Sequence, residues 1–242
     1  MQLSQPIAIG GQYKNKVRQA RATLNATKAA HEVEVQNVRH EARVAFIDLY
    51  YTQQKLKVYD KEMASVENIS KACGEQTEKG NVSKMEAFRV AAMLSQLRAE
   101  RAELQIGAEE LQSQLRLLLN LQDSEPIVAL LDEDGAMDMV RSSLARLQPT
   151  VLSSDPALLQ SLLLTHYRAT MQQLKLVEDN RQHLAVDLDQ LLLAAEEQFL
   201  KRNISVVEFV DLYSSYRDTN FMMEDGKAQL FKSNEELKKY AQ

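Results

Sequence analysis

The sequence is poor in the residues that interrupt helices. It contains seven glycines and four prolines in 242 residues, no tryptophan, and no proline between Pro6 and Pro126. Proline removes a backbone donor and glycine lowers helix stability, so a proline-free span of this length predicts long, uninterrupted helices. The chain is long enough for one or two domains with a sizeable core.

Other absences exclude classes of protein. The single cysteine, Cys73, excludes an intramolecular disulfide. No apolar run approaches the roughly 18 residues of a membrane-spanning helix. The first residues have neither a basic region nor an apolar core, so no signal peptide is recognised and the chain as written is expected in the cytoplasm. The net charge is −5, with lysine and arginine interspersed among the acids, which argues against nucleic acid as a partner.

No nucleotide-binding or catalytic signature is present, so an enzyme is the least favoured class. Gly74 and Gly80 are one residue too far apart for a P-loop. His31-Glu32 and His40-Glu41 each match half of a zinc-protease motif, but valine replaces the second histidine in both. We interpret the histidines and Cys73 as packing or surface residues, and we expect no cofactor and no metal site.

A short pattern that occurs twice organises the rest of the chain. Gly80–Glu86 and Arg202–Glu208 both contain Asn, a β-branched residue, Ser, two variable residues and Glu, at a constant offset of 122 residues. In each copy Ser is suited to cap a helix and Glu to complete the capping box. Gly80, or Asn81 and Asn203, suits the left-handed end of the preceding helix. The repeat predicts two helical hairpins with similar tips, at 79–83 and 201–205, at the same end of the molecule.

The spacing of apolar residues predicts the helices of these hairpins. A heptad pattern from Tyr13 to Glu78 predicts one helix of ~95–100 Å, which suits a coiled coil or a tube. The helix after Ser83 has two apolar rows, as expected for a helix packed between two neighbours. The alanine-rich row comprises Met85, Phe88, Ala92, Ser95, Ala99, Ala102 and Ile106. The leucine-rich row comprises Val90, Leu94, Leu97, Arg101, Leu104, Ala108, Leu111, Leu115 and Leu118.

These patterns predict an all-α fold of long antiparallel coiled-coil hairpins. Residues 1–12 are interpreted as a strand remnant with a glycine turn, and 13–121 as the first hairpin. Residues 122–155 form a connector with a short helix near 136–147, and 156–242 form the second hairpin. Asp155 and Pro156 are expected to start a helix in which a break falls near Asp179–Arg181.

Four segments resemble the outer-membrane efflux protein family, the TolC-like channels. Gln5–Gly11 is similar to the end of a β-hairpin followed by Gly-Gly and a long helix, and Glu78–Ser83 with Glu86 is similar to the first periplasmic tip. Leu117–Leu121 is similar to the end of the returning helix. Lys201–Asp211 is similar to the second tip, especially in the CzcC-like branch associated with heavy-metal efflux. The resemblance covers most of the chain, most strongly residues 5–121 and 184–240.

The resemblance implies a homotrimer whose protomers build an outer-membrane β-barrel and a periplasmic tunnel of helices. Its partners are a periplasmic adaptor and an inner-membrane RND pump, and its substrates are metal cations or small toxic compounds. It assigns adaptor docking to Gly80, Asn81, Val82, Asn203 and Ile204, and a channel constriction to Glu208 and Asp211. The family's signal peptide, first helices and most barrel strands have no counterpart here, which suggests a truncated protomer located, as the family is, in the outer membrane and periplasm.

Two alternatives are a coiled-coil scaffold without a transport function and a non-functional truncated fragment. A scaffold predicts a single apolar row and no matched tips, so the double row and the repeat favour the channel. Structural roles also exist for the candidate residues: Val82 and Ile204 as hydrophobic staples, and Glu208 as a capping partner.

Overall fold

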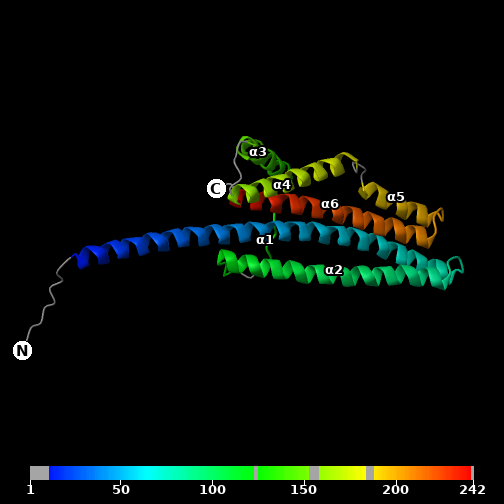
Figure 1. Ribbon diagram of the computed structural model, residues 1–242. Coiled ribbons are helices and arrows are strands. Elements are labelled where there is room, and N and C mark those ends of the chain that lie inside the picture. Colours follow the sequence, from blue (N-terminus) through cyan, green and yellow to red (C-terminus); the bar gives the residue numbers. More distant parts are fainter. Residues whose placement is uncertain (1–10, 123–124, 153–157, 184–187, 241–242) are drawn as a thin grey trace, which may run out of the picture. The chain divides into compact units, whose positions relative to one another are not determined.

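A computed structural model describes residues 11–122, 125–152, 158–183 and 188–240. Within these ranges all regular structure is helical and no strand occurs, which confirms the predicted all-α class (Figure 1). The helices are α1 (Gln12–Glu78), α2 (Lys84–Leu119), α3 (Glu133–Leu152), α4 (Leu158–His183), α5 (Leu188–Leu200) and α6 (Val206–Tyr240). None of them has the combination of length and apolar character needed to cross a membrane. The predicted strand remnant and the predicted Asp155-Pro156 helix start lie outside the described residues.

Two helix boundaries differ from the sequence-based prediction. The connector helix is longer than 136–147: α3 begins at Glu133, because the Asp132 carboxylate accepts a hydrogen bond from the Gly135 amide (3.2 Å), and it continues to Leu152. A helix break was expected near Asp179–Arg181; α4 continues through these residues and ends at His183, and α5 begins at Leu188, so the two helices separate slightly later than predicted. Polar residues at that point lie on the helix surface, where Arg181 pairs with Asp134 of α3 at 3.3 Å.

The chain divides into two compact units, residues 1–41 and 42–242. In the first unit the described residues form the N-terminal part of α1, and none of the side chains described there is buried. Leu24 of the heptad pattern is 53% exposed, so the described part of this unit contains no partner for that pattern. The packing described below belongs to the second unit.

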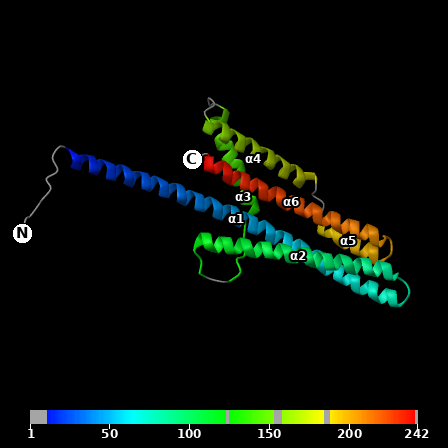
Figure 2. The same ribbon diagram turned by 60° about the horizontal axis from the view of Figure 1, so that its bottom comes forward.

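In the second unit, α1 is antiparallel to α2 and also packs against α6 (Figures 1 and 2). One cluster, here called the tip cluster, joins α1 (Val66, Ile69), α2 (Val90, Leu97), α5 (Leu192, Ala195) and α6 (Phe209, Tyr213). A second cluster continues from Ala45 of α1 to α3, α4 and the C-terminal part of α6. Both α4 and α5 pack along α6. The result is two hairpins, α1–α2 and α5–α6, that share a core.

The two apolar rows of α2 have different environments. The leucine-rich row faces the core, with Val90, Leu94, Leu97, Ala108 and Leu115 buried. All seven residues of the alanine-rich row are exposed, including Phe88 at 68% and Met85 at 65%. The double row predicted two neighbours for α2, and the described chain buries only the leucine-rich row.

The connector is anchored to α1 by a single side chain. Gln53 donates from Nε2 to the Ile127 carbonyl (2.7 Å), and its Oε1 accepts from the Ala129 amide (3.0 Å). The amide side chain thus pairs with an extended backbone as a neighbouring strand would. Val128 and Leu130, which alternate with the anchored residues, are 70% and 82% exposed.

Candidate functional site: paired tips and an adjoining groove

The two repeated turns lie side by side at one end of the hairpins (Figures 1 and 2). Both predicted capping boxes are present. The Ser83 hydroxyl accepts from the Glu86 amide (3.2 Å), and the Glu86 carboxylate accepts from the Ser83 amide (2.9 Å). Ser205 and Glu208 make the same two bonds at 3.2 and 2.7 Å. Each hairpin therefore reverses direction with the same local chemistry.

The repeat extends further into the preceding helices than the sequence pattern indicated. The Asn81 and Asn203 amides donate to the carbonyls of Gln76 (2.8 Å) and Gln198 (2.9 Å). Their side-chain Nδ2 atoms donate to the side-chain Oε1 atoms of the same glutamines, at 2.9 and 2.6 Å. Sequence reasoning missed both glutamines, although they are also 122 residues apart and a backward extension of the repeat would have found them.

The left-handed residue of each tip is the one before asparagine. Gly80 has φ +72° and Arg202 has φ +61°, so the suggested left-handed conformation at Asn81 or Asn203 is wrong. The asparagine backbone is instead held by the hydrogen bond to glutamine. Arginine in this region costs roughly 1–2 kcal/mol because its Cβ approaches the following carbonyl. The two tips thus share the asparagine–glutamine and capping-box hydrogen bonds but differ in backbone strain.

A groove of about 360 Å³ separates the two tips. Cys73, Gln76 and Val82 line it from the first hairpin, and Phe199 and Ile204 from the second. Val82 and Ile204 are half-buried and pack on the tip cluster, in agreement with their alternative role as staples. The five docking candidates therefore lie together, with Gly80, Asn81 and Asn203 exposed at the rim. Burial raises the pKa of the Cys73 thiol, with a smaller contribution from Glu86, and keeps it in the neutral form.

The two constriction candidates have different partners. Glu208 is exposed, and the hydrogen bonds from Ser205 hold the pKa of its carboxyl below the ordinary value. Asp211 is exposed and makes no hydrogen bond or ion pair with any residue that the structure describes. Capping therefore accounts for Glu208 and leaves Asp211 without a structural role.

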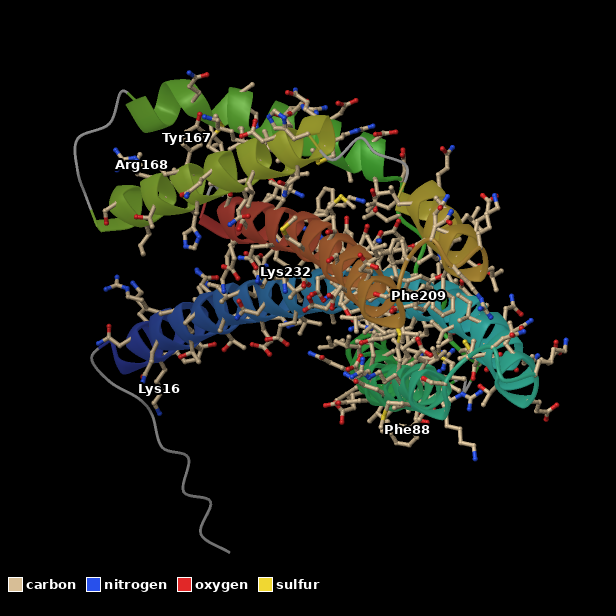
Figure 3. The ribbon with its side chains drawn as sticks, turned by 90° about the vertical axis from the view of Figure 1, so that its right-hand side faces the viewer. Lys16, Phe88, Tyr167, Arg168, Phe209 and Lys232 are labelled. Carbon is tan, nitrogen blue, oxygen red and sulfur yellow. The ribbon has the colours of Figure 1, made fainter. Side chains whose placement is uncertain are left out.

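Asp211 lies on a second groove, of about 370 Å³, between α2 and α6. Phe88 and Ala92 of the alanine-rich row line one side, and Val207 and Val210 line the other. Figure 3 marks the contrast between Phe88, exposed on α2, and Phe209, fully buried on α6. Because Phe88 and Ala92 belong to the alanine-rich row, the groove adjoins the exposed apolar surface of α2.

These features define a class: an all-helical protein in which two hairpins pack together and present matched tips at one end. Among the described residues, no group of three or more His, Cys, Asp or Glu side chains could hold a metal ion. Comparison with protein-family models, with curated proteins and with solved structures gives no match to this chain.

Proposed function

We propose that the chain is the channel component of a tripartite RND-type efflux system: a homotrimer whose helices form a periplasmic tunnel below the outer membrane and whose tips bind a periplasmic adaptor. Metal cations or small toxic compounds are the proposed substrates. The observation that carries the proposal is the exposed alanine-rich row of α2. A non-transport helical scaffold is the second candidate, because the core and the capped tips alone would serve one.

The repeat supplies an argument for what covers this row. Adding the offset of 122 to the alanine-rich row gives a row on α6: Val207, Val210, Ser214, Arg217, Phe221, Glu224 and Ala228. Beyond Val207, which is 51% exposed near the tip, this row packs inside the chain. Phe221 lies 5.3 Å from the Tyr59 ring of α1, and Arg217 binds Glu62 of α1. The α6 row thus joins the second hairpin to the first. The corresponding alanine-rich row of α2, on the first hairpin, is exposed.

A free counterpart of an internal interface supports a head-to-tail assembly. If the second hairpin of another copy packs on the α2 row, the same kind of contact alternates within and between chains. A contact of this type closes into a ring when its rotation allows. Alanine and serine at Ala92, Ser95, Ala99 and Ala102 permit the close approach of a neighbouring helix. Such a ring of helices is a tunnel wall.

The tips and the acidic residues fit the remaining parts of the proposal. The rim residues Asn81 and Asn203 are available to an adaptor, and the groove between the tips offers it apolar contacts. In a trimer, Glu208 and Asp211 form rings of six carboxylates, which attract cations and create a selective constriction. The free Asp211 carboxylate supports this role better than Glu208, which already caps α6.

Light scattering tests the assembly. We expect a trimer for the native chain and dissociation for Ala99→Glu, with an unchanged helical circular dichroism spectrum. Ala64→Glu is the matched control, because it places the same charge at an exposed alanine of α1 outside the row. A monomeric native chain, or equal dissociation by both variants, argues against the proposal.

Cross-linking tests adaptor binding. In a Cys73→Ser background, Asn81→Cys and Asn203→Cys are expected to cross-link to a co-expressed periplasmic adaptor. Glu110→Cys, exposed in the C-terminal half of α2 and away from the tips, should not. A trimer that cross-links equally from all three positions supports the scaffold instead.

A further inference from the structure

A carboxylate without solvent exposure lies where three helices meet. Glu62 of α1 is 0% exposed, and its two oxygens lie 3.2 and 3.4 Å from Nη1 of Arg217 on α6. The same Nη1 is 3.8 Å from Glu100 of α2, which also accepts a hydrogen bond from the Tyr59 hydroxyl (3.1 Å). One guanidinium is therefore shared by two carboxylates.

Of the charges that act on Glu62 among the described residues, Arg217 is the cation and the others are negative. Asp218 of α6 acts on Glu62 as a further repulsive charge. The Tyr213 and Tyr216 hydroxyls of α6 also feel the Glu62 charge, but Tyr213 bonds to Ser65 and Tyr216 donates to Asp189 of α5. Burying an ionised carboxylate without full compensation is costly. The layer formed by Glu62, Arg217 and Glu100 is therefore more stable when one of its carboxyl groups is protonated.

Arg217 connects Glu62 to a groove at the protein surface. Arg217 lines the groove between α2 and α6, and its side chain is 14% exposed. Its guanidinium also lies over the Tyr59 ring, at 5.9 Å from the centroid. Arg217 thus stands between the groove and Glu62.

We propose that the Glu62–Arg217–Glu100 layer is a proton-operated latch between the two hairpins. With Glu62 protonated, Arg217 neutralises Glu100 and α6 packs firmly on α1. When Glu62 releases its proton through the groove to solvent, two carboxylates compete for one guanidinium and the packing of α6 weakens. The latch concerns contacts within one chain and does not depend on the proposed channel.

The direction of the pH response follows from the environment of Glu62. Burial raises its pKa to about 7, and the opposing effect of Arg217 is smaller. The packing that depends on the proton is therefore complete in mild acid and is lost as the pH rises through about 7.

Hydrogen exchange and infrared spectroscopy of the full chain test the latch. Corrected for intrinsic exchange, amide protection in residues 206–221 should fall about ten-fold or more between about pH 5.5 and 8.5. Glu62→Gln should abolish this fall, and Glu110→Gln, an exposed control on α2, should retain it. The infrared band of a protonated carboxyl should disappear from the native chain over the same range.

Two results would overturn the latch: native protection that does not change with pH, or a Glu62→Gln chain that keeps the native response. Should Glu62→Gln fail to fold, Glu100→Gln decides the question. It leaves Arg217 to Glu62 alone, so the protonated-carboxyl band should disappear at a lower pH than in the native chain. An unchanged position of that band contradicts the shared guanidinium.

Discussion

Replacing each of two phenylalanines with alanine should distinguish a residue that stabilises the fold from one that contributes to self-association. Phe209 is 0% exposed, and its ring centroid lies 4.7 Å from that of Phe199 and 4.2 Å from that of Tyr213. Phe88 lies on the free row of α2 and is 68% exposed (Figure 3). The change to alanine removes the same atoms at both positions, so the environment alone determines the difference.

We expect Phe209→Ala to lower the free energy of unfolding by about 4 kcal/mol. Large-to-small changes at buried aromatic positions cost about 3–5 kcal/mol, because apolar burial is lost and a cavity remains. For a chain of this size the midpoint temperature should fall by ~8–16 °C. Phe88→Ala should change stability by less than about 0.5 kcal/mol, because its ring has little burial to lose.

Urea unfolding followed by circular dichroism measures both values. Self-association makes apparent stability depend on concentration, so the comparison belongs at a concentration where the chains are dissociated. At higher concentration light scattering should show weaker association for Phe88→Ala. If the two variants lose similar stability, or if Phe209→Ala loses less than about 1 kcal/mol, α6 does not pack in the tip cluster as described.

Three further predictions concern the tips and the charged layer. Arg202→Gly should raise stability by about 1 kcal/mol by removing left-handed strain, whereas Gly80→Ala, the matched change in the first tip, should lower it by a similar amount; thermal melts measure both. The raised pKa of Glu62 predicts a loss of about 2.5 kcal/mol in unfolding free energy between about pH 5 and pH 8, and urea titrations of Glu62→Gln should lack this loss. In the proposed channel, Asp211→Asn should reduce cation conductance and divalent block without changing the melting temperature. Glu208→Gln should also lower the melting temperature through its cap; normal conductance in both variants would exclude the proposed constriction.

The tips were predictable from the sequence because their information is local. A capping box is specified within four residues, and its recurrence at a constant offset identified both turns. The left-handed positions were less predictable, because an asparagine competes with the preceding residue for that conformation and Arg202 occupies it only with support from the bond between Asn203 and Gln198. Which residue of the second tip is left-handed therefore depends on contacts with the preceding helix, and the short repeated pattern does not contain them.

The burial of Glu62 could not be read from the heptad pattern. That pattern selects the positions facing one partner, such as Tyr59 and Val66, and residue 62 does not belong to it. In the second unit α1 contacts both α2 and α6, so a second set of positions is buried, including Val58, Glu62 and Ile69. Apolar periodicity on one helix does not report how many neighbours it has. The start of α3 differs from the prediction for another reason: the cap from Asp132 to the Gly135 amide is local, but Asp132 lies in an acidic run that the sequence pattern places in the connector.

The anchoring of the connector by Gln53 has a consequence for how the chain tolerates changes in length. Between the end of α2 at Asn120 and the anchored backbone at Ile127, the exposed Arg116 side chain of α2 donates to the Glu125 carbonyl (2.7 Å), a contact that a longer connection could keep or replace. Doubling the length of such a loop costs about 0.6 kcal/mol, so insertions there should be accepted. From Ile127 to Glu133 the backbone runs directly from the anchor into α3, and each added residue would displace that helix from the core residues Met137 and Val140 that it buries. Natural and engineered insertions should therefore accumulate on one side of a single glutamine and be absent from the other.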